Sequence, residues 1–176
     1  MKRYSYISHM FICFLLVLFD QITKYFARLY LKQQPFTILE GIFSFHYHEN
    51  RGSVWGILQG KVDFLLLVSI ILLVGLVFAY IRIPKTKFYE PLIWIIVFIT
   101  AGAIGNTIDR LFLGYVTDFL YFELIDFPIF NIADCYITLC SFLTIFLVFT
   151  KYKEDEFTFL TIYRKDTSNA TNTDEN

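Results

Sequence analysis

Four segments of the sequence are long and apolar enough to cross a bilayer, and they constrain the fold more than any other feature. A helix needs about 20 mostly apolar residues to span the hydrocarbon core. We expect spanning helices over residues 4–26, 62–82, 91–111 and 132–151. The composition agrees, because only 18% of residues are charged, against about 25% in soluble domains. The chain is predicted to be an all-α membrane protein, a bundle of four transmembrane helices.

The segment between the first two spans, residues 35–60, is too polar to cross the membrane. Phe43, Phe45 and Tyr47 alternate there with polar residues, which is the pattern of a half-buried strand. We therefore expect a small extracytoplasmic sheet, a β-cradle, between the first and second helices.

An even number of spans places both ends of the chain on one side of the membrane. Nine of the 15 basic residues fall on that side: Lys2, Arg3, Arg82, Lys85, Lys87, Lys151, Lys153, Arg164 and Lys165. Basic residues are enriched in cytoplasmic segments, so both termini are predicted to be cytoplasmic. Residues 1–153 are expected to form one membrane domain, and residues 154–176 a cytoplasmic tail with a disordered end.

Two aspartates, Asp118 and Asp134, lie close to apolar runs, where an ionisable side chain costs a few kcal/mol and suggests a functional site. The intervening Phe127-Pro128 returns the chain to the membrane, so the two acids can approach each other. Two carboxyls that share a site cannot both ionise cheaply, which would supply one general base and one general acid. The alternative is that Asp134 only caps the fourth helix and that Asp118 is a solvated loop acid.

Other polar residues fall at the same ends of the predicted helices. Asp20 and Lys24 are four residues apart and can pair, although an interfacial ion pair is the simpler explanation. The third predicted helix ends with a polar group at positions i, i+3 and i+4: Asn106, Asp109 and Arg110. At this spacing, Asn106 or Asp109 can hold the Arg110 guanidinium group, and its remaining donors can face a peptide carbonyl or carboxylate. The alternative for Arg110 is a snorkelling side chain with local partners.

The second half of the sequence contains two further features of this kind. Asn131 and Asp134 are three residues apart, so they lie on one helical face. Gly102 and Gly105 permit close helix contact, which is ordinary in membrane packing.

Other chemistries find less support in the sequence. His46 and His48 could share a strand face as metal ligands, but no third ligand follows at a familiar spacing, so no metal is expected. Cys13, Cys135 and Cys140 lie in apolar runs and are interpreted as packing residues. A Gly-x-Ser-x-Gly motif is absent, and a net charge of −1 gives no reason to expect a nucleic-acid partner.

Five short motifs within residues 5–152 together resemble the bacterial lipoprotein signal peptidase family, the type II signal peptidases, which are intramembrane aspartyl proteases. The motifs are Asp20-Gln21-x-x-Lys24, Asn50-x-Gly52-x-x-Trp55-Gly56, Gly102-x-x-Gly105-Asn106-x-x-Asp109-Arg110, Val116-x-Asp118-Phe119 and Phe130-Asn131-x-Ala133-Asp134. Each motif alone is weak, and their order over nearly the whole chain makes the resemblance specific.

The resemblance implies that Asp118 and Asp134 form a catalytic dyad. The implied substrate-binding or supporting residues are Asp20, Lys24, Asn50, Gly52, Asn106, Asp109, Arg110 and Asn131. It further implies cleavage of prolipoproteins before a diacylglyceryl-modified cysteine, at the extracytoplasmic face of the bacterial cytoplasmic membrane. Phospholipid contact and globomycin inhibition are implied too, with no metal or organic cofactor. We expect a monomer.

A small ion- or proton-coupled carrier is the alternative from a different class, because intramembrane acids also relay protons. Such carriers favour acids near the midplane and paired broken helices that arise from repeats. Here the acids lie at helix ends, and no internal repeat is visible. A non-catalytic scaffold would leave both acids unexplained.

Overall fold

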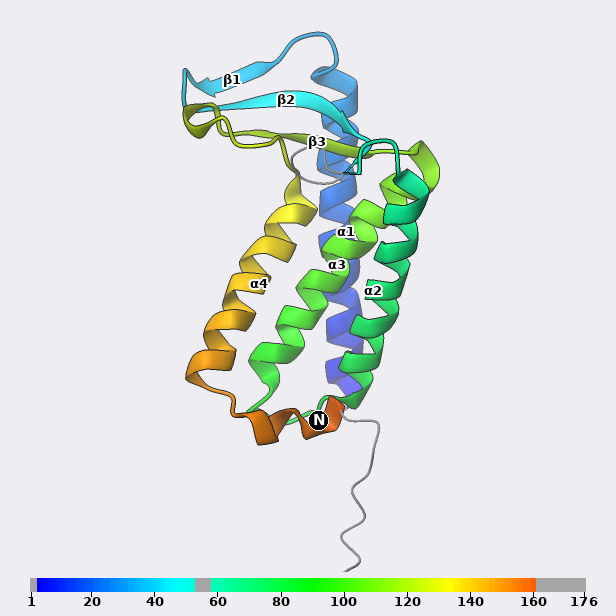
Figure 1. The fold of residues 1–176 in the computed structure, drawn as a ribbon, viewed down its shortest axis with the longest axis vertical. Coiled ribbons are helices and arrows are strands. Elements are labelled where there is room, and N and C mark those ends of the chain that lie inside the picture. The colour runs from blue at the N-terminus through cyan, green and yellow to red at the C-terminus, as the bar shows by residue number, and fades with distance from the viewer. Residues whose placement is uncertain (1–2, 53–57, 161–176) are drawn as a thin grey trace, which may run out of the picture.

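The computed structural model describes residues 3–52 and 58–160, and four long helices dominate this part of the chain (Figure 1). They are α1 (Arg3–Tyr30), α2 (Val62–Arg82), α3 (Glu90–Leu113) and α4 (Ile132–Thr150). All four are long and apolar enough to cross a membrane. The predicted four-helix membrane bundle is confirmed.

Helix α3 packs against each of the other three helices. Two glycines make this possible: a Cβ at Gly102 would lie 2.6 Å from the carbonyl oxygen of Ala133 on α4, and one at Gly105 would overlap the Asp20 carboxylate on α1. The expected role of both glycines in close helix contact is confirmed. By contrast, none of the residues of α2 is buried, which fits a helix that faces lipid.

A three-stranded antiparallel sheet lies across one end of the bundle, in the order β1 (Phe36–Leu39), β2 (Phe43–Asn50) and β3 (Val116–Tyr121) (Figure 1). The alternating segment is indeed a strand, β2. The third strand is a correction to the expected sheet, which was predicted only between the first two helices, and it contains Asp118. Asp118 is therefore a buried strand residue, and the alternative of a solvated loop acid is wrong. Five of the six residues of β3 are buried, so the strand shows no alternation to reveal it.

The opposite end of the bundle is closed by apolar packing and by the short 3-10 helix η3 (Glu154–Leu160) (Figure 1). Its buried cluster consists of Ile83, Leu92, Ile93, Ile96 and Tyr152. The predicted disorder at the chain end, residues 166–176, lies outside the described residues, as do Trp55 and Gly56 of the second motif.

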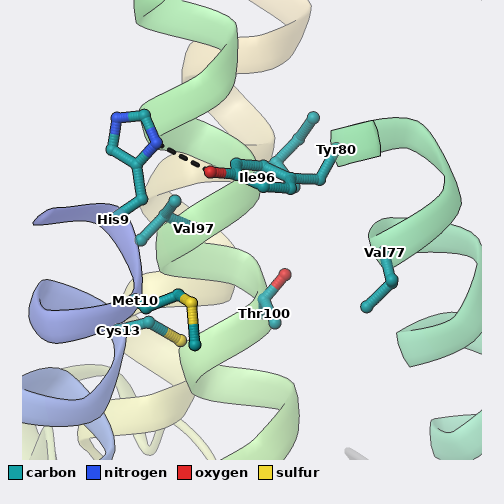
Figure 2. Close-up of a pocket in the computed structure, with 8 residues that line it drawn as sticks. All are labelled: His9, Met10, Cys13, Val77, Tyr80, Ile96, Val97 and Thr100. Carbon is teal, nitrogen blue, oxygen red and sulfur yellow. Dashed lines mark hydrogen bonds between the residues drawn. The ribbon is translucent and has the colours of Figure 1, made fainter. Parts of the chain in front are cut away.

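An apolar groove lies between α1, α2 and α3, and Figure 2 shows its lining. On its wall, His9 Nδ1 and the Tyr80 hydroxyl are 2.8 Å apart, which links α1 to α2. The His9 ring also packs edge-on against Trp94, with the ring centroids 4.7 Å apart. The residues that line this groove include no carboxylate.

Candidate active site

Asp118 and Asp134 come together where β3 meets the first turn of α4. Asp118 is 1% exposed, whereas Asp134 is partly exposed. The Asp118 oxygens accept hydrogen bonds from the side-chain amides of Asn131 (2.6 Å) and Asn50 (2.9 Å). The Asp134 oxygens accept from the Asn106 side-chain amide (2.8 Å) and from the Asn131 backbone N–H (3.1 Å). Each of the four carboxylate oxygens therefore accepts one N–H, and Asn131 contacts both acids.

Asn131 holds this place because it is the N-cap of α4. Its side-chain oxygen accepts from the Asp134 backbone N–H (3.1 Å), and Asp134 bonds back, which completes a capping box. Asp134 thus takes part in capping the fourth helix, as the alternative interpretation held. The capping box uses one Asp134 oxygen, and the other accepts from Asn106. Asp134 can therefore stabilise the helix end and belong to the acidic site at the same time.

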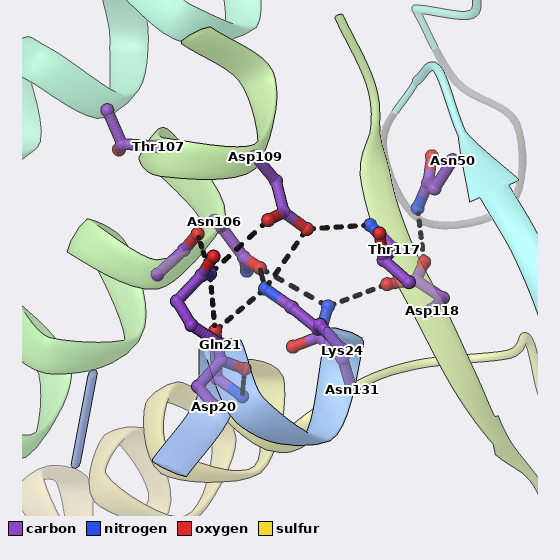
Figure 3. Close-up of polar contacts among 12 residues, drawn as sticks. Asp20, Gln21, Lys24, Asn50, Asn106, Thr107, Asp109, Thr117, Asp118 and Asn131 are labelled. Carbon is purple, nitrogen blue, oxygen red and sulfur yellow. Dashed lines mark hydrogen bonds and ion pairs between the residues drawn. The ribbon is translucent and has the colours of Figure 1, made fainter. Parts of the chain in front are cut away.

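A buried ion-pair network of Asp20, Lys24 and Asp109 adjoins Asn106 (Figure 3). Lys24 Nζ is 2.9 Å from an Asp20 oxygen and 3.5 Å from an Asp109 oxygen, and it donates to Asn106 Oδ1 over 2.8 Å. The other Asp20 oxygen accepts from the Ala133 backbone N–H of α4 (3.0 Å). Asp20 and Lys24 are completely buried, so the simpler explanation, an interfacial pair, does not apply.

Three residues of this network were not among the predicted site residues: Gln21, Arg28 and Thr117. Asp109 accepts from the Thr117 backbone N–H (2.8 Å) and from Gln21 (3.3 Å), while Arg28 donates to the Thr117 hydroxyl (3.0 Å). A signal for Arg28 was available, because it follows Lys24 at the same four-residue spacing that separates Lys24 from Asp20.

The predicted partner of Arg110 is a correction. Its guanidinium donates to the Ser69 hydroxyl of α2 over 3.4 Å rather than to Asn106 or Asp109. The oxygens of those two residues are already occupied by donors from other elements, mainly Lys24 and the Thr117 backbone. The i, i+3, i+4 spacing could not reveal this, because it does not define how α3 is rotated relative to its neighbours. The charge of Arg110 still acts on both Asp118 and Asp134.

Gly52 and Asn50 form a tight turn at the end of β2. The backbone N–H of Gly52 donates to Asn50 Oδ1 (3.0 Å), so the Asn50 amide nitrogen is directed to Asp118. Burial, and next the charge of Asp134, raise the pKa of Asp118 to about 7. One acid of the pair is therefore suited to hold a proton near neutral pH.

The bundle, the sheet and the paired carboxylates define a class, the multi-pass membrane proteins with an acidic site near one end of the bundle. The family model described as "Signal peptidase (SPase) II" matches residues 12–150. The chain belongs to the signal peptidase II family, whose members are aspartic-type proteases.

The relatives agree over most of their length. A lipoprotein signal peptidase of Staphylococcus aureus is 35% identical over 160 residues, which cover 88% of this chain and 97% of the relative. The lipoprotein signal peptidase of Staphylococcus aureus strain JH9 is 36% identical over 141 residues, 78% of this chain and 85% of that protein. A bacterial membrane enzyme solved by the in meso method at 2.3 Å shares 33% identity and a TM-score of 0.72, covering 84% of this chain and 92% of that one. The family resemblance is confirmed, and the carrier alternative is set aside.

Proposed function

We propose that this enzyme removes the signal peptide from diacylglyceryl-modified prolipoproteins, with Asp118 and Asp134 as the catalytic dyad. The observation that carries the proposal is the position of Asn131, which bonds Asp118 through its side chain and Asp134 through its backbone. One residue thereby holds both carboxyls at one site. The relatives named lipoprotein signal peptidases supply the substrate class.

The proposed chemistry is hydrolysis by one ionised and one protonated carboxyl. Asp134 takes a proton from a water molecule whose oxygen attacks the scissile carbonyl carbon, and Asp118 gives its proton to the carbonyl oxygen. The resulting gem-diol then collapses: its hydroxyl returns a proton to Asp118, the C–N bond breaks, and the proton on Asp134 passes to the leaving amine. The raised pKa of Asp118, about 7, supports a pair in which one carboxyl holds a proton near neutral pH. The reaction needs no metal or organic cofactor.

The substrate proposed here is itself anchored in the bilayer, so its signal peptide can reach the acids from the lipid side. Large apolar residues of α2 and α4 are exposed, among them Ile71 (62%) and Phe142 (68%). Such surfaces suit contact with the signal peptide, the diacylglyceryl chains and membrane phospholipid. Arg110 lies on α3, and the one hydrogen bond described for its guanidinium goes to Ser69. Its other donors could then serve a substrate carbonyl.

The proposal includes a location. The helix ends that are remote from the sheet carry or precede the basic residues Arg82, Lys85, Lys87, Lys151 and Lys153. The positive-inside rule then supports cytoplasmic termini and an active site at the extracytoplasmic face of a bacterial cytoplasmic membrane. We further propose that the enzyme acts as a monomer, that globomycin-type inhibitors occupy the same site, and that no nucleic acid is involved.

A cleavage assay tests this function. Purified protein is incubated with one precursor prepared with and without the diacylglyceryl group on its cysteine, and the products are identified by mass. Cleavage of only the modified precursor, directly before the cysteine, is the expected result. Equal cleavage of both forms would indicate a general peptidase, and cleavage of neither would reject the proposed substrate.

A further inference from the structure

Three asparagines surround the acids, and the direction of each side-chain amide decides whether it can bond a carboxylate. An amide has an accepting oxygen and a donating nitrogen, so only its nitrogen can bond an ionised carboxyl. In Asn50 and Asn131 the oxygen accepts from a backbone N–H, that of Gly52 and that of Asp134. The nitrogens of both amides consequently face Asp118.

Asn106 differs, because side chains direct its oxygen. That oxygen accepts from Lys24 Nζ (2.8 Å) and from the Asn131 side-chain amide (3.2 Å). An ammonium group has donors and no acceptor, so it can face only the oxygen of the amide. The Asn106 nitrogen then points to Asp134, to which it donates over 2.8 Å.

We propose that Lys24 is a positioning residue that acts through Asn106: its ammonium group fixes the amide direction that lets Asn106 hold the Asp134 carboxylate. With the amide reversed, an oxygen would face Asp134, and two acceptors repel each other. The inference rests on the proposed function of the dyad. It assigns Lys24 a task beyond the ion pair with Asp20.

The environment of Lys24 fits this task. The side chain is completely buried, and its three neighbours Asp20, Asp109 and Asn106 match the three donors of an ammonium group. The Asp20 and Asp109 carboxylates compensate the charge of the buried ammonium group. The third donor remains for the oxygen of the Asn106 amide, whose nitrogen bonds Asp134 directly.

The test compares two double variants that both remove the ion pair. Asp20→Asn/Lys24→Gln keeps a neutral N–H donor near Asn106, whereas Asp20→Asn/Lys24→Met has none. Asp20→Asn alone measures the loss of the carboxylate, and Ile93→Ala, at the other end of the bundle, is a control for lowered thermal stability. All are assayed in lipid with the diacylglyceryl-modified precursor.

The positioning role predicts similar melting temperatures for the two double variants and a kcat about tenfold lower for the Met variant, the effect of one hydrogen bond of ordinary strength. KM should agree within about twofold, because Lys24 does not touch the substrate. Ile93→Ala should lower the melting temperature and keep the wild-type kcat at assay temperature. Equal kcat values in the two double variants would overturn the role and leave a structural ion pair.

If the double variants do not fold, a measurement on the wild-type chain tests the amide direction that the proposal requires. In protein with 15N-labelled asparagine, the Asn106 side-chain signal, assigned by its loss in Asn106→Ser, should shift as the dyad titrates. A signal that does not respond to pH would mean that the nitrogen faces away from Asp134, against the proposal. This readout is independent of turnover, so an enzyme that cleaves no lipidated precursor would reject the proposed function without deciding the amide direction.

Discussion

The side-chain amide of Asn131 donates to the Asp118 carboxylate over 2.6 Å, which links the N-terminus of a membrane helix to a strand of the surface sheet. The same side chain caps α4 through its oxygen. The cap and the carboxylate contact use opposite ends of one amide, so they can be separated by substitution.

Asn131→Ser tests that separation. Serine is also a good N-cap, so the thermal stability should change little. Serine cannot reach Asp118 as the amide does, and loss of a hydrogen bond to a charged group should lower kcat by about 10- to 100-fold. Steady-state kinetics and thermal unfolding are measured together. A variant that loses stability but keeps kcat would show that the cap is the only role of Asn131.

The pH dependence of turnover tests the protonated state of Asp118. With a pKa of about 7, Asp118 carries its proton below neutral pH and loses it as the pH rises, so kcat should fall on the alkaline side. The acidic limb then reports ionisation of its partner, and both limbs belong to the coupled pair.

Asn50→Ala provides the matching variant. The hydrogen bond from Asn50 lowers the pKa of Asp118, so its removal should move the alkaline limb to higher pH. The other charged or titratable groups near Asp118 are Asp134, Lys24, Arg110 and, across the strand pair, His48. All of them stay in this variant. A limb that stays in place or moves to lower pH would contradict the assignment of the acid.

Gly105→Ala tests the close approach of α1 and α3. A Cβ there would overlap the buried Asp20 carboxylate, so the free energy of unfolding should fall by about 1–3 kcal/mol, as is typical of overpacking. Gly75→Ala on α2 is the control, because its Cβ would meet nothing within 4 Å. The control should be neutral or stabilising by up to about 1 kcal/mol. Unfolding in denaturing detergent measures both, and equal stabilities would refute the contact.

Arg110→Lys tests substrate handling. A point charge cannot reproduce the planar fork of the guanidinium, so kcat/KM for the lipidated precursor should fall about tenfold, mainly through KM. Ser69→Ala leaves Arg110 in place and removes the hydroxyl that it bonds. The fall in kcat/KM should be smaller in this variant than in Arg110→Lys. Unchanged kcat/KM in Arg110→Lys would exclude a substrate contact.

The membrane helices could be predicted from the sequence because each apolar run is long. The acidic pair could be predicted because Asp118 and Asp134 each lie beside such a run. Strand β3 could not be recognised, since a strand buried on both faces lacks the alternation that revealed β2. The partner of Arg110 also escaped prediction. Sequence spacing defines neighbours on one helix face, but contacts between helices depend on how each helix is rotated.

The most direct test of the dyad is the turnover of Asp118→Asn and Asp134→Asn. Each substitution keeps the shape of the side chain and removes the ionisable group, so kcat on the diacylglyceryl-modified precursor should fall by at least about 100-fold while the protein still inserts and folds. Asp126→Asn, an exposed acid in the same connection between β3 and α4, should cleave like the wild type. Cleavage at the wild-type rate by either dyad variant would contradict the central claim.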